Sequence, residues 1–274
     1  MHTVTANGAA IPALGFGTFR MPGPDTARMV PAVLALGYRH IDTAQIYGNE
    51  DAVGAGIAAS GVPRGDIFLT TKVWVKNYRD SAFHASVDES LRKLGTDYVD
   101  LLLLHWPNAD VPLAEQIGAL NAVRQAGKVR HIGVSNFSTA LMAEAGRLSA
   151  APLVTNQIEY HPYLDQTAVI GAARAAGMAV TAYYAMADGK VLADERLRAV
   201  AARHGRTVAQ VVLRWLVQQP GVVALSKTVS AARAAENAAI FDFTLPPEDM
   251  AAIHALATPD GRLVSPAGLA PVWD

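Results

Sequence analysis

The sequence predicts an α/β fold in one domain, with parallel strands that alternate with helices. Eight short β-type runs alternate with longer stretches whose apolar residues recur at helical spacing. No proline- or serine-rich linker and no block of like charge divides the 274 residues. Because an α/β barrel of about 250 residues forms a single unit, we expect one domain over residues 1–274.

The predicted strands follow one another along the whole chain. They cover residues 14–17, 39–42, 67–72, 98–105, 132–135, 154–157, 179–183 and 222–227. Stretches 81–95 and 167–177 are typical of the helices between them, since each shows helical spacing and ends in a glycine suited to a C-cap. An open doubly wound sheet is compatible with this alternation, but the count of eight favours a closed barrel.

One proline conflicts with this assignment. Pro31 falls inside the first helical stretch, DTARMVPAVLALG, where an interior proline costs about 3 kcal/mol. We therefore expect either a helix that begins near Pro31 or a separate turn over residues 25–30.

Composition excludes several classes of function. A net charge of −1 gives no electrostatic reason to expect nucleic acid or an anionic membrane as a partner. The chain has no cysteine, so disulfides, thiolate nucleophiles and cysteine-ligated zinc are excluded, and a reducing cytoplasm is compatible with the sequence. No signal peptide and no apolar run of membrane-spanning length is visible. We expect a cytoplasmic monomer.

Four familiar motifs are set aside. Residues 54–59, GAGIAA, match a dinucleotide fingerprint, but they lie inside an expected helix, where small residues that pack a helix against a sheet are the better interpretation. Ser135 lies in GVSNF, which is not a hydrolase elbow. No tyrosine is followed four residues later by the lysine of short-chain dehydrogenases, and no histidine pair has zinc spacing. No metal site is indicated.

Polar side chains mark the ends of most predicted strands. These residues are Asp42, Lys72, His105, Ser135, Asn136, Gln157, Tyr183 and Lys227. The first three strand ends and Ser135 follow one another at steps of about 30 residues, the length of one β-α-β unit. In a parallel barrel these ends meet at one rim, where catalytic residues collect.

Asp42, Tyr47, Lys72 and His105 are the candidate reaction centre. A free phenol, with a pKa of about 10, is a weak acid near neutrality. We expect the Lys72 ammonium to lower the pKa of Tyr47, while Asp42 keeps Lys72 charged and oriented. His105 could then hydrogen-bond the oxygen of a substrate. This set suits protonation of a carbonyl oxygen as hydride arrives at its carbon.

The remaining polar strand ends suit a hydride-donating cofactor. Ser135, Asn136 and Gln157 offer hydrogen bonds to a carboxamide, and Tyr183 offers a flat face to a nicotinamide ring. Lys227, Thr228 and Arg233 surround the last strand end and the next helix start, which is a natural phosphate site.

Several motifs together resemble the aldo-keto reductases. In chain order they are HIDTAQIYGNE, LTTKVW, LLLLHWP, GVSNF, NQIEYHPYL and K-T-x4-R-x3-N from Lys227. The similarity covers essentially the whole chain. The tail RLVSPAGLAPVWD is most similar to the bacterial 2,5-diketo-D-gluconate reductase B group, which is also described as methylglyoxal reductases.

The resemblance implies a (β/α)8 TIM barrel with extra helices and a C-terminal loop, which binds NADPH across its C-terminal rim. It implies that Tyr47 is the general acid, supported by Asp42 and Lys72, and that His105 orients the carbonyl. The implied nicotinamide contacts are Gly17, Thr18, Asp42, Ser135, Asn136, Gln157 and Tyr183, and the implied contacts to the 2′-phosphate and adenine are Lys227, Thr228, Arg233, Glu236 and Asn237. The implied substrate-pocket residues are Phe19, Tyr47, Trp74, His105 and Trp106.

The chain departs from the family pattern at a few positions. After Tyr183 the family usually has Ser-Pro-Leu, whereas residues 184–186 here are Tyr-Ala-Met. Ser226 replaces a common proline, and Thr228 replaces a common serine. The cations Lys227 and Arg233 remain, so we expect a preference for NADPH over NADH.

The sequence thus favours an NADPH-dependent oxidoreductase that reduces small aldehydes, α-dicarbonyls such as methylglyoxal, or keto-sugar acids such as 2,5-diketo-D-gluconate. Two alternatives stay open. Lys72 could act as the Schiff-base amine of a barrel lyase. The chain could also bind NADPH without turnover, as a regulatory module.

Overall fold

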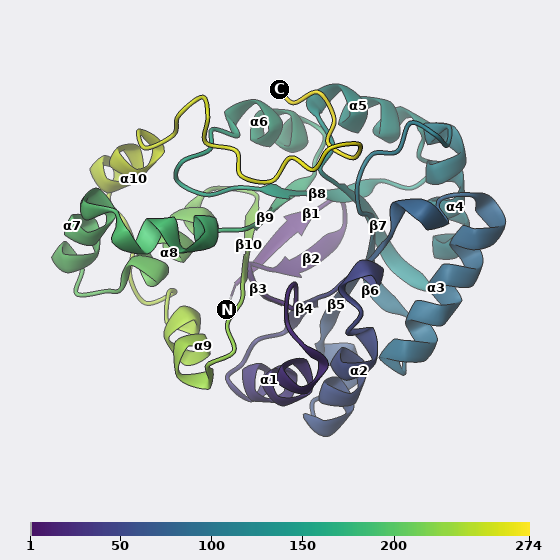
Figure 1. Ribbon diagram of the computed structural model, residues 1–274, viewed down its shortest axis with the longest axis horizontal. Helices are drawn as coiled ribbons and strands as arrows, with labels where there is room; N and C mark the ends of the chain where they lie inside the picture. Colours follow the sequence, from purple (N-terminus) through teal and green to yellow (C-terminus); the bar gives the residue numbers. More distant parts are fainter. Residues whose placement is uncertain (1) are drawn as a thin grey trace.

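The computed structural model describes residues 2–274, and eight parallel strands form a closed barrel at its centre (Figure 1). The barrel strands are β3 (Leu14–Gly17), β4 (His40–Asp42), β5 (Phe68–Val73), β6 (Val99–Leu104), β7 (Val129–Ser135), β8 (Leu153–Glu159), β9 (Ala179–Tyr183) and β10 (Val222–Ser226). Each pairs in parallel with the next along the chain, and β10 pairs with β3 where Ala224 lies opposite Leu14. This last pairing closes the sheet, so the barrel prediction is confirmed and the open doubly wound alternative is wrong.

All eight predicted strands are present. Two have the predicted bounds, 14–17 and 179–183, and the other six shift at one or both ends. The largest shift is in β7, which begins at Val129 and not at residue 132. The polar residues that were predicted to end the strands therefore lie at, or within two residues of, the observed ends.

Helices surround the barrel (Figure 1). They are α1 (Gly23–Ala35), α2 (Glu50–Ala59), α3 (Asp80–Leu94), α4 (Leu113–Gln125), α5 (Thr139–Leu148), α6 (Thr167–Ala175), α7 (Glu195–Arg203), α8 (Val208–Gln218), α9 (Ala231–Ala238) and α10 (Pro247–His254), with 3₁₀ turns η1 (Gln45–Tyr47), η2 (Arg64–Asp66), η3 (Val75–Asn77) and η4 (Ala187–Ala193). The predicted helix 81–95 ends as expected, with Gly95 at φ 63° after α3. Within residues 2–274, no helix combines the length and apolar character that a membrane span requires.

Both expectations for Pro31 are wrong. Helix α1 runs through it without a break, from Gly23 to Ala35, and carries Pro24 in its first turn, where the missing N–H costs nothing. Pro31 removes one hydrogen bond from the helix interior. Packing offsets this loss, because Val30 and Pro31 lie against Gly56 of α2, where an added Cβ would meet Val30 Cβ at 2.7 Å.

That contact also corrects the interpretation of residues 54–59. They lie inside α2, as predicted, so they cannot form the strand-to-helix turn of a dinucleotide site. Their packing partners, however, are helices and not a sheet. A Cβ at Gly54 would lie 2.5 Å from the carbonyl oxygen of Leu94 at the end of α3. The small residues of α2 therefore allow α1 and α3 to approach it closely.

An N-terminal hairpin, which was not predicted, closes one end of the barrel. Strands β1 (Thr3–Ala6) and β2 (Ala9–Pro12) are joined by Asn7 and Gly8, both with positive φ. Asn-Gly between two short strands is a strong hairpin signal, and it was available in the sequence. The Asn7 amide donates to the carbonyl oxygens of Leu153 and Ala176, which places the hairpin at the starts of the strands. The hairpin does not cover the opposite rim, where the strands end, so that rim can hold a functional site.

Candidate active site

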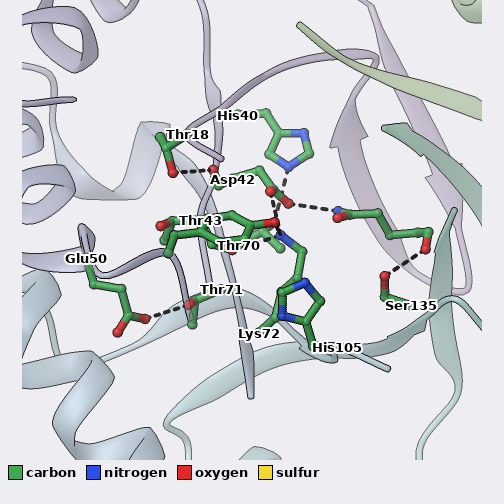
Figure 2. Close-up of polar contacts among 12 residues, drawn as sticks. Thr18, His40, Asp42, Thr43, Glu50, Thr70, Thr71, Lys72, His105 and Ser135 are labelled. Carbon is green, nitrogen blue, oxygen red and sulfur yellow. Dashed lines mark hydrogen bonds and ion pairs between the residues drawn. The ribbon is translucent and has the colours of Figure 1, made fainter. Parts of the chain in front are cut away.

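Asp42, Lys72, His105 and Ser135, four of the predicted strand-end residues, lie together at one rim of the barrel (Figure 2). Asp42 is the last residue of β4, and Lys72 is the penultimate residue of β5. His105 directly follows β6, and its backbone N–H donates to the carbonyl oxygen of Val73 at 3.2 Å. The prediction that these side chains gather is confirmed.

A buried lysine is the centre of this cluster. Lys72 has no exposed surface, and its Nζ donates to Asp42 Oδ1 at 2.6 Å, to the Thr43 carbonyl oxygen at 2.9 Å and to the Tyr47 hydroxyl at 3.2 Å. These three acceptors match the three hydrogens of an ammonium group. The ammonium is thus fixed against the phenol oxygen.

Both carboxylate oxygens of Asp42 accept hydrogen bonds. Oδ2 accepts a hydrogen bond from Gln157 Nε2 at 2.8 Å, and Oδ1 is taken by Lys72. The Asp42 backbone carbonyl oxygen also accepts from the N–H and the hydroxyl of Thr18, at 3.0 and 3.1 Å. Gly17, at the end of β3, lies opposite Asp42 in the sheet. Gln157 and Thr18, whose cofactor contacts are predictions, thus hold the carboxylate and the backbone of Asp42, respectively.

A short turn after β4 brings the Tyr47 phenol next to Lys72. After β4 the chain forms η1 over Gln45–Tyr47 and leaves it through Gly48 at φ 66°. The five-residue spacing between Asp42 and Tyr47 is thus spanned by a strand end and one 3₁₀ turn, and not by one face of a helix. The Tyr47 ring packs 5.0 Å from the Phe19 ring and 5.7 Å from the His105 ring, centroid to centroid.

Gln45 anchors this turn, although no sequence motif pointed to it. Its side-chain oxygen accepts from the Trp74 N–H and from Asn77 Nδ2, both at 2.9 Å. Its side-chain nitrogen donates to the Ser86 carbonyl oxygen at 3.1 Å and to Ser90 Oγ at 3.2 Å. The only sequence signal was its position between Asp42 and Tyr47, because its partners come from η3 and α3.

Asn49 is a second residue that was missed. Its buried amide nitrogen donates to the carbonyl oxygens of Thr18 and Met21, and its oxygen accepts from the Thr43 hydroxyl at 2.9 Å. It therefore joins the loop after β3 to the loop after β4. These are the two loops that carry Phe19 and Tyr47.

Burial sets the protonation of the reaction centre. Burial, followed by the charge of Asp42, raises the pKa of the Tyr47 phenol well above its ordinary value. The expectation of a lowered Tyr47 pKa is therefore wrong, because removal from water and the Asp42 charge both raise it. Burial also lowers the pKa of Lys72, although the Asp42 carboxylate offsets this effect. Tyr47 is consequently a neutral phenol that retains its proton at neutral pH.

His105 is a neutral imidazole for a related reason. Burial, and next the charge of Lys72, lower the pKa of His105 well below its ordinary value. The ring lies between Tyr47 and Trp74, with the Trp74 centroid 5.3 Å away. Its Nδ1 is buried and has no hydrogen-bond partner among the described residues. A neutral imidazole can donate one hydrogen bond to a carbonyl oxygen.

The aromatic residues differ in exposure. Phe19 is 46% exposed beside Tyr47, and Trp74 is partly exposed beside His105, so both can contact a molecule on the rim. Trp106 is only 6% exposed, with its ring 6.3 Å from the Trp273 ring in the C-terminal tail. Their roles in substrate binding stay predictions.

The predicted carboxamide-binding residues form one hydrogen-bonded group beside His105. Ser135 Oγ donates to the Gln157 carbonyl oxygen at 2.8 Å. Asn136 Nδ2 donates to the His105 carbonyl oxygen at 3.0 Å, and Asn136 Oδ1 accepts from the Tyr183 hydroxyl at 2.7 Å. The ring of Tyr183 remains partly exposed, which leaves a flat face at the rim.

The predicted phosphate-binding residues lie after β10. Lys227 and Arg233 are exposed, and no carboxylate among the described residues forms an ion pair with either. The Thr228 hydroxyl accepts from the Ser230 N–H at 3.1 Å, next to the start of α9. Glu236 is already paired, since its carboxylate accepts from the Thr207 hydroxyl at 2.7 Å, and Asn237 is buried.

Comparisons with known proteins agree with this geometry. The sequence model of the Aldo/keto reductase family matches residues 13–258. Methylglyoxal reductase DkgB of Escherichia coli O157:H7 is 45% identical over 97% of this chain and 100% of its own length. A solved structure described as a candidate 2,5-diketo-D-gluconic acid reductase B is 67% identical, with a TM-score of 0.99 over 100% of this chain and 98% of that one. A Gox0644 variant solved in complex with NADPH is 34% identical, with a TM-score of 0.90 over 97% of this chain and 96% of that one.

Proposed function

The chain belongs to the aldo/keto reductase family, and from this membership we propose that it is an NADPH-dependent reductase of small carbonyl compounds. The proposed substrates are small aldehydes, α-dicarbonyls such as methylglyoxal, and keto-sugar acids such as 2,5-diketo-D-gluconate. The observation that carries the proposal is the neutral phenol of Tyr47, held 3.2 Å from the buried ammonium of Lys72.

Each residue of the reaction centre has a separate proposed task. Tyr47 donates its proton to the carbonyl oxygen, and the Lys72 ammonium stabilises the phenolate that remains. Asp42 compensates the buried charge of Lys72 and holds it in place. His105, a neutral imidazole whose ring packs beside Tyr47, orients the carbonyl oxygen toward Tyr47. The alcohol product forms once the carbonyl carbon has also received a hydride.

The residues present fit NADPH as the cofactor. When bound, NADPH supplies the hydride. Lys227 and Arg233 are exposed cations with no carboxylate partner among the described residues, and such a pair suits a 2′-phosphate. The partly exposed ring of Tyr183 offers a stacking face, and Ser135 and Asn136 lie next to it on the rim.

The Schiff-base alternative is disfavoured by the surroundings of Lys72. A lysine that attacks a carbonyl must be deprotonated and reachable. Lys72 has no exposed surface, and its three hydrogens are occupied by Asp42, Thr43 and Tyr47. A covalent adduct at Lys72 trapped by borohydride would contradict our proposal.

Loss of NADPH absorbance in the presence of a carbonyl tests the function directly. We expect turnover within a panel of methylglyoxal, 2,5-diketo-D-gluconate and β-keto esters, with the alcohol identified by mass spectrometry. Protein that binds NADPH but consumes none with any member of the panel would instead support the regulatory alternative.

Lys227→Ala should weaken NADPH binding about tenfold, which corresponds to about 1.4 kcal/mol for one charge-assisted contact. NADH binding should change little, because NADH lacks the 2′-phosphate. Fluorescence titration with both cofactors measures the two dissociation constants. Lys93→Ala, which removes a lysine from α3, is the matched control. An equal loss of affinity for NADPH and NADH would show that Lys227 does not contact the 2′-phosphate.

A further inference from the structure

Glu159 is a fully buried carboxylate that the proposed reaction does not use. It is the last residue of β8 and has no exposed surface. Its Oε1 accepts from His161 Nε2 and from the Leu263 N–H, both at 2.8 Å, and its Oε2 accepts from the Val264 N–H at 2.9 Å. A buried charge is costly unless it is paired and hydrogen-bonded. Here two backbone amides of the C-terminal tail, residues 255–274, satisfy it.

The tail approaches Glu159 along a narrow path. The Tyr163 carbonyl oxygen accepts from the Thr258 N–H at 3.1 Å. A Cβ at Gly261 would lie 1.7 Å from that same oxygen, so only glycine fits there. Arg262 follows, with its guanidinium 3.9 Å from Glu159 Oε2 and only 16% of its side chain exposed. The path therefore brings the amides of residues 263 and 264 to the carboxylate.

From Glu159 the tail crosses the rim to α5, passing α6 and β8 (Figure 1). The Asp274 carboxylate accepts from the Thr139 N–H at 2.9 Å and from the Thr139 hydroxyl at 2.5 Å, at the start of α5. The tail is thus attached at two places, to the end of β8 and to the beginning of α5.

Between these attachments the tail places an aromatic ring beside the reaction centre. Trp273 lies 6.3 Å from the ring of Trp106, the residue that follows His105. The Arg262 guanidinium stacks over Trp273, 3.7 Å from the ring centroid. Arg262 therefore lies near both the Glu159 carboxylate and the ring of Trp273.

We propose that Glu159 is a positioning residue for substrate binding, which fixes the tail so that Trp273 and Trp106 together form one side of the substrate pocket. This inference rests on the proposed carbonyl reduction. Glu159 acts through the tail and has no part in proton transfer, because the hydrogen-bond partners of its carboxylate, His161 and the amides of residues 263 and 264, lie outside the reaction centre. Loss of the carboxylate should consequently affect KM and not kcat.

Glu159→Gln tests the docking of the tail by proteolysis. Glutamine has nearly the same shape, but its NH₂ group cannot accept a hydrogen bond, so one tail amide loses its partner. Trypsin cleaves after Arg262, at the bond whose N–H Glu159 holds. We expect cleavage at that bond to be roughly tenfold faster in the variant, since the tail opens more often. Mass spectrometry identifies the product that ends at Arg262, and Glu144→Gln on exposed α5 surface is the matched control.

Steady-state kinetics test the effect on the pocket. We expect Glu159→Gln to raise KM for methylglyoxal and for the larger 2,5-diketo-D-gluconate about fivefold or more, with kcat within about a factor of two and NADPH affinity unchanged. Trp273→Ala keeps the Glu159 bonds to the tail amides but removes the ring that stacks on Arg262, so it should raise KM equally with a smaller increase in cleavage after Arg262 than Glu159→Gln. If Glu159→Gln does not fold, Trp273→Ala and Asp274→Asn carry the kinetic test, and each must raise KM.

Three results would overturn the inference. They are unchanged cleavage in Glu159→Gln, faster cleavage in that variant with an unchanged KM, and an unchanged KM in Trp273→Ala. The proteolysis does not depend on turnover. If the wild-type protein reduced no carbonyl, the proposed function would fail while the docking of the tail by Glu159 would still be measured.

Discussion

Tyr47→Phe will lower kcat for carbonyl reduction by about 10²- to 10⁴-fold, the range that a general acid contributes. The substitution removes only the hydroxyl group, whose oxygen lies 3.2 Å from Lys72 Nζ. The ring remains packed against Phe19 and His105. Because the fold and the cofactor residues are untouched, NADPH affinity should stay within about a factor of two of the wild type.

Single-turnover reduction of methylglyoxal measures the rate of the chemical step, and NADPH titration measures cofactor affinity separately. Tyr98→Phe is the matched control. Tyr98 packs between Arg64 and Arg130 at the start of β6, at the other end of the barrel, and phenylalanine keeps these contacts. Normal turnover by Tyr47→Phe would show that the proton comes from another group. Equal losses in Tyr47→Phe and Tyr98→Phe would indicate a general effect on folding.

The fold was predictable because its signals are local. Strand-like runs, helical spacing and terminal glycines such as Gly95 are read within a few residues, and parallel strands with helical connections leave few architectures. The same rule placed Asp42, Lys72 and His105 together. The ends of parallel strands share a rim whatever the rest of the sequence contains.

The Asn7-Gly8 hairpin had a local signal, but the other errors have a common physical origin in contacts between distant segments. Pro31 looked incompatible with a helix interior until the close packing of α2 at Gly56 was known. The direction of the Tyr47 pKa was wrong because burial is a property of the folded rim and not of neighbours in the sequence. Gln45 and Glu159 act through partners in other elements, so no local pattern distinguishes them.

Lys72→Met should destabilise the protein by about 3–5 kcal/mol and also remove its activity. The side chain is fully buried, and its loss leaves the Asp42 carboxylate buried with Gln157 Nε2 as its one remaining side-chain partner. In a chain of this size the melting temperature should fall by roughly 10 °C. Reduction should fall by about 10²-fold or more, because no ammonium then stabilises the Tyr47 phenolate.

A double substitution separates the loss of stability from the loss of activity. In Lys72→Met with Asp42→Asn, neither buried charge remains, and Gln157 can still hydrogen-bond the asparagine. Most of the lost stability should therefore return, since an uncharged pair of similar volume replaces a broken ion pair. Activity should not return, because the phenolate still lacks its cation. Thermal unfolding and single-turnover kinetics measure stability and turnover for the wild type, Lys72→Met and the double variant. Recovery of turnover along with stability would mean that Lys72 serves the fold alone and that the phenol of Tyr47 needs no cation to donate its proton.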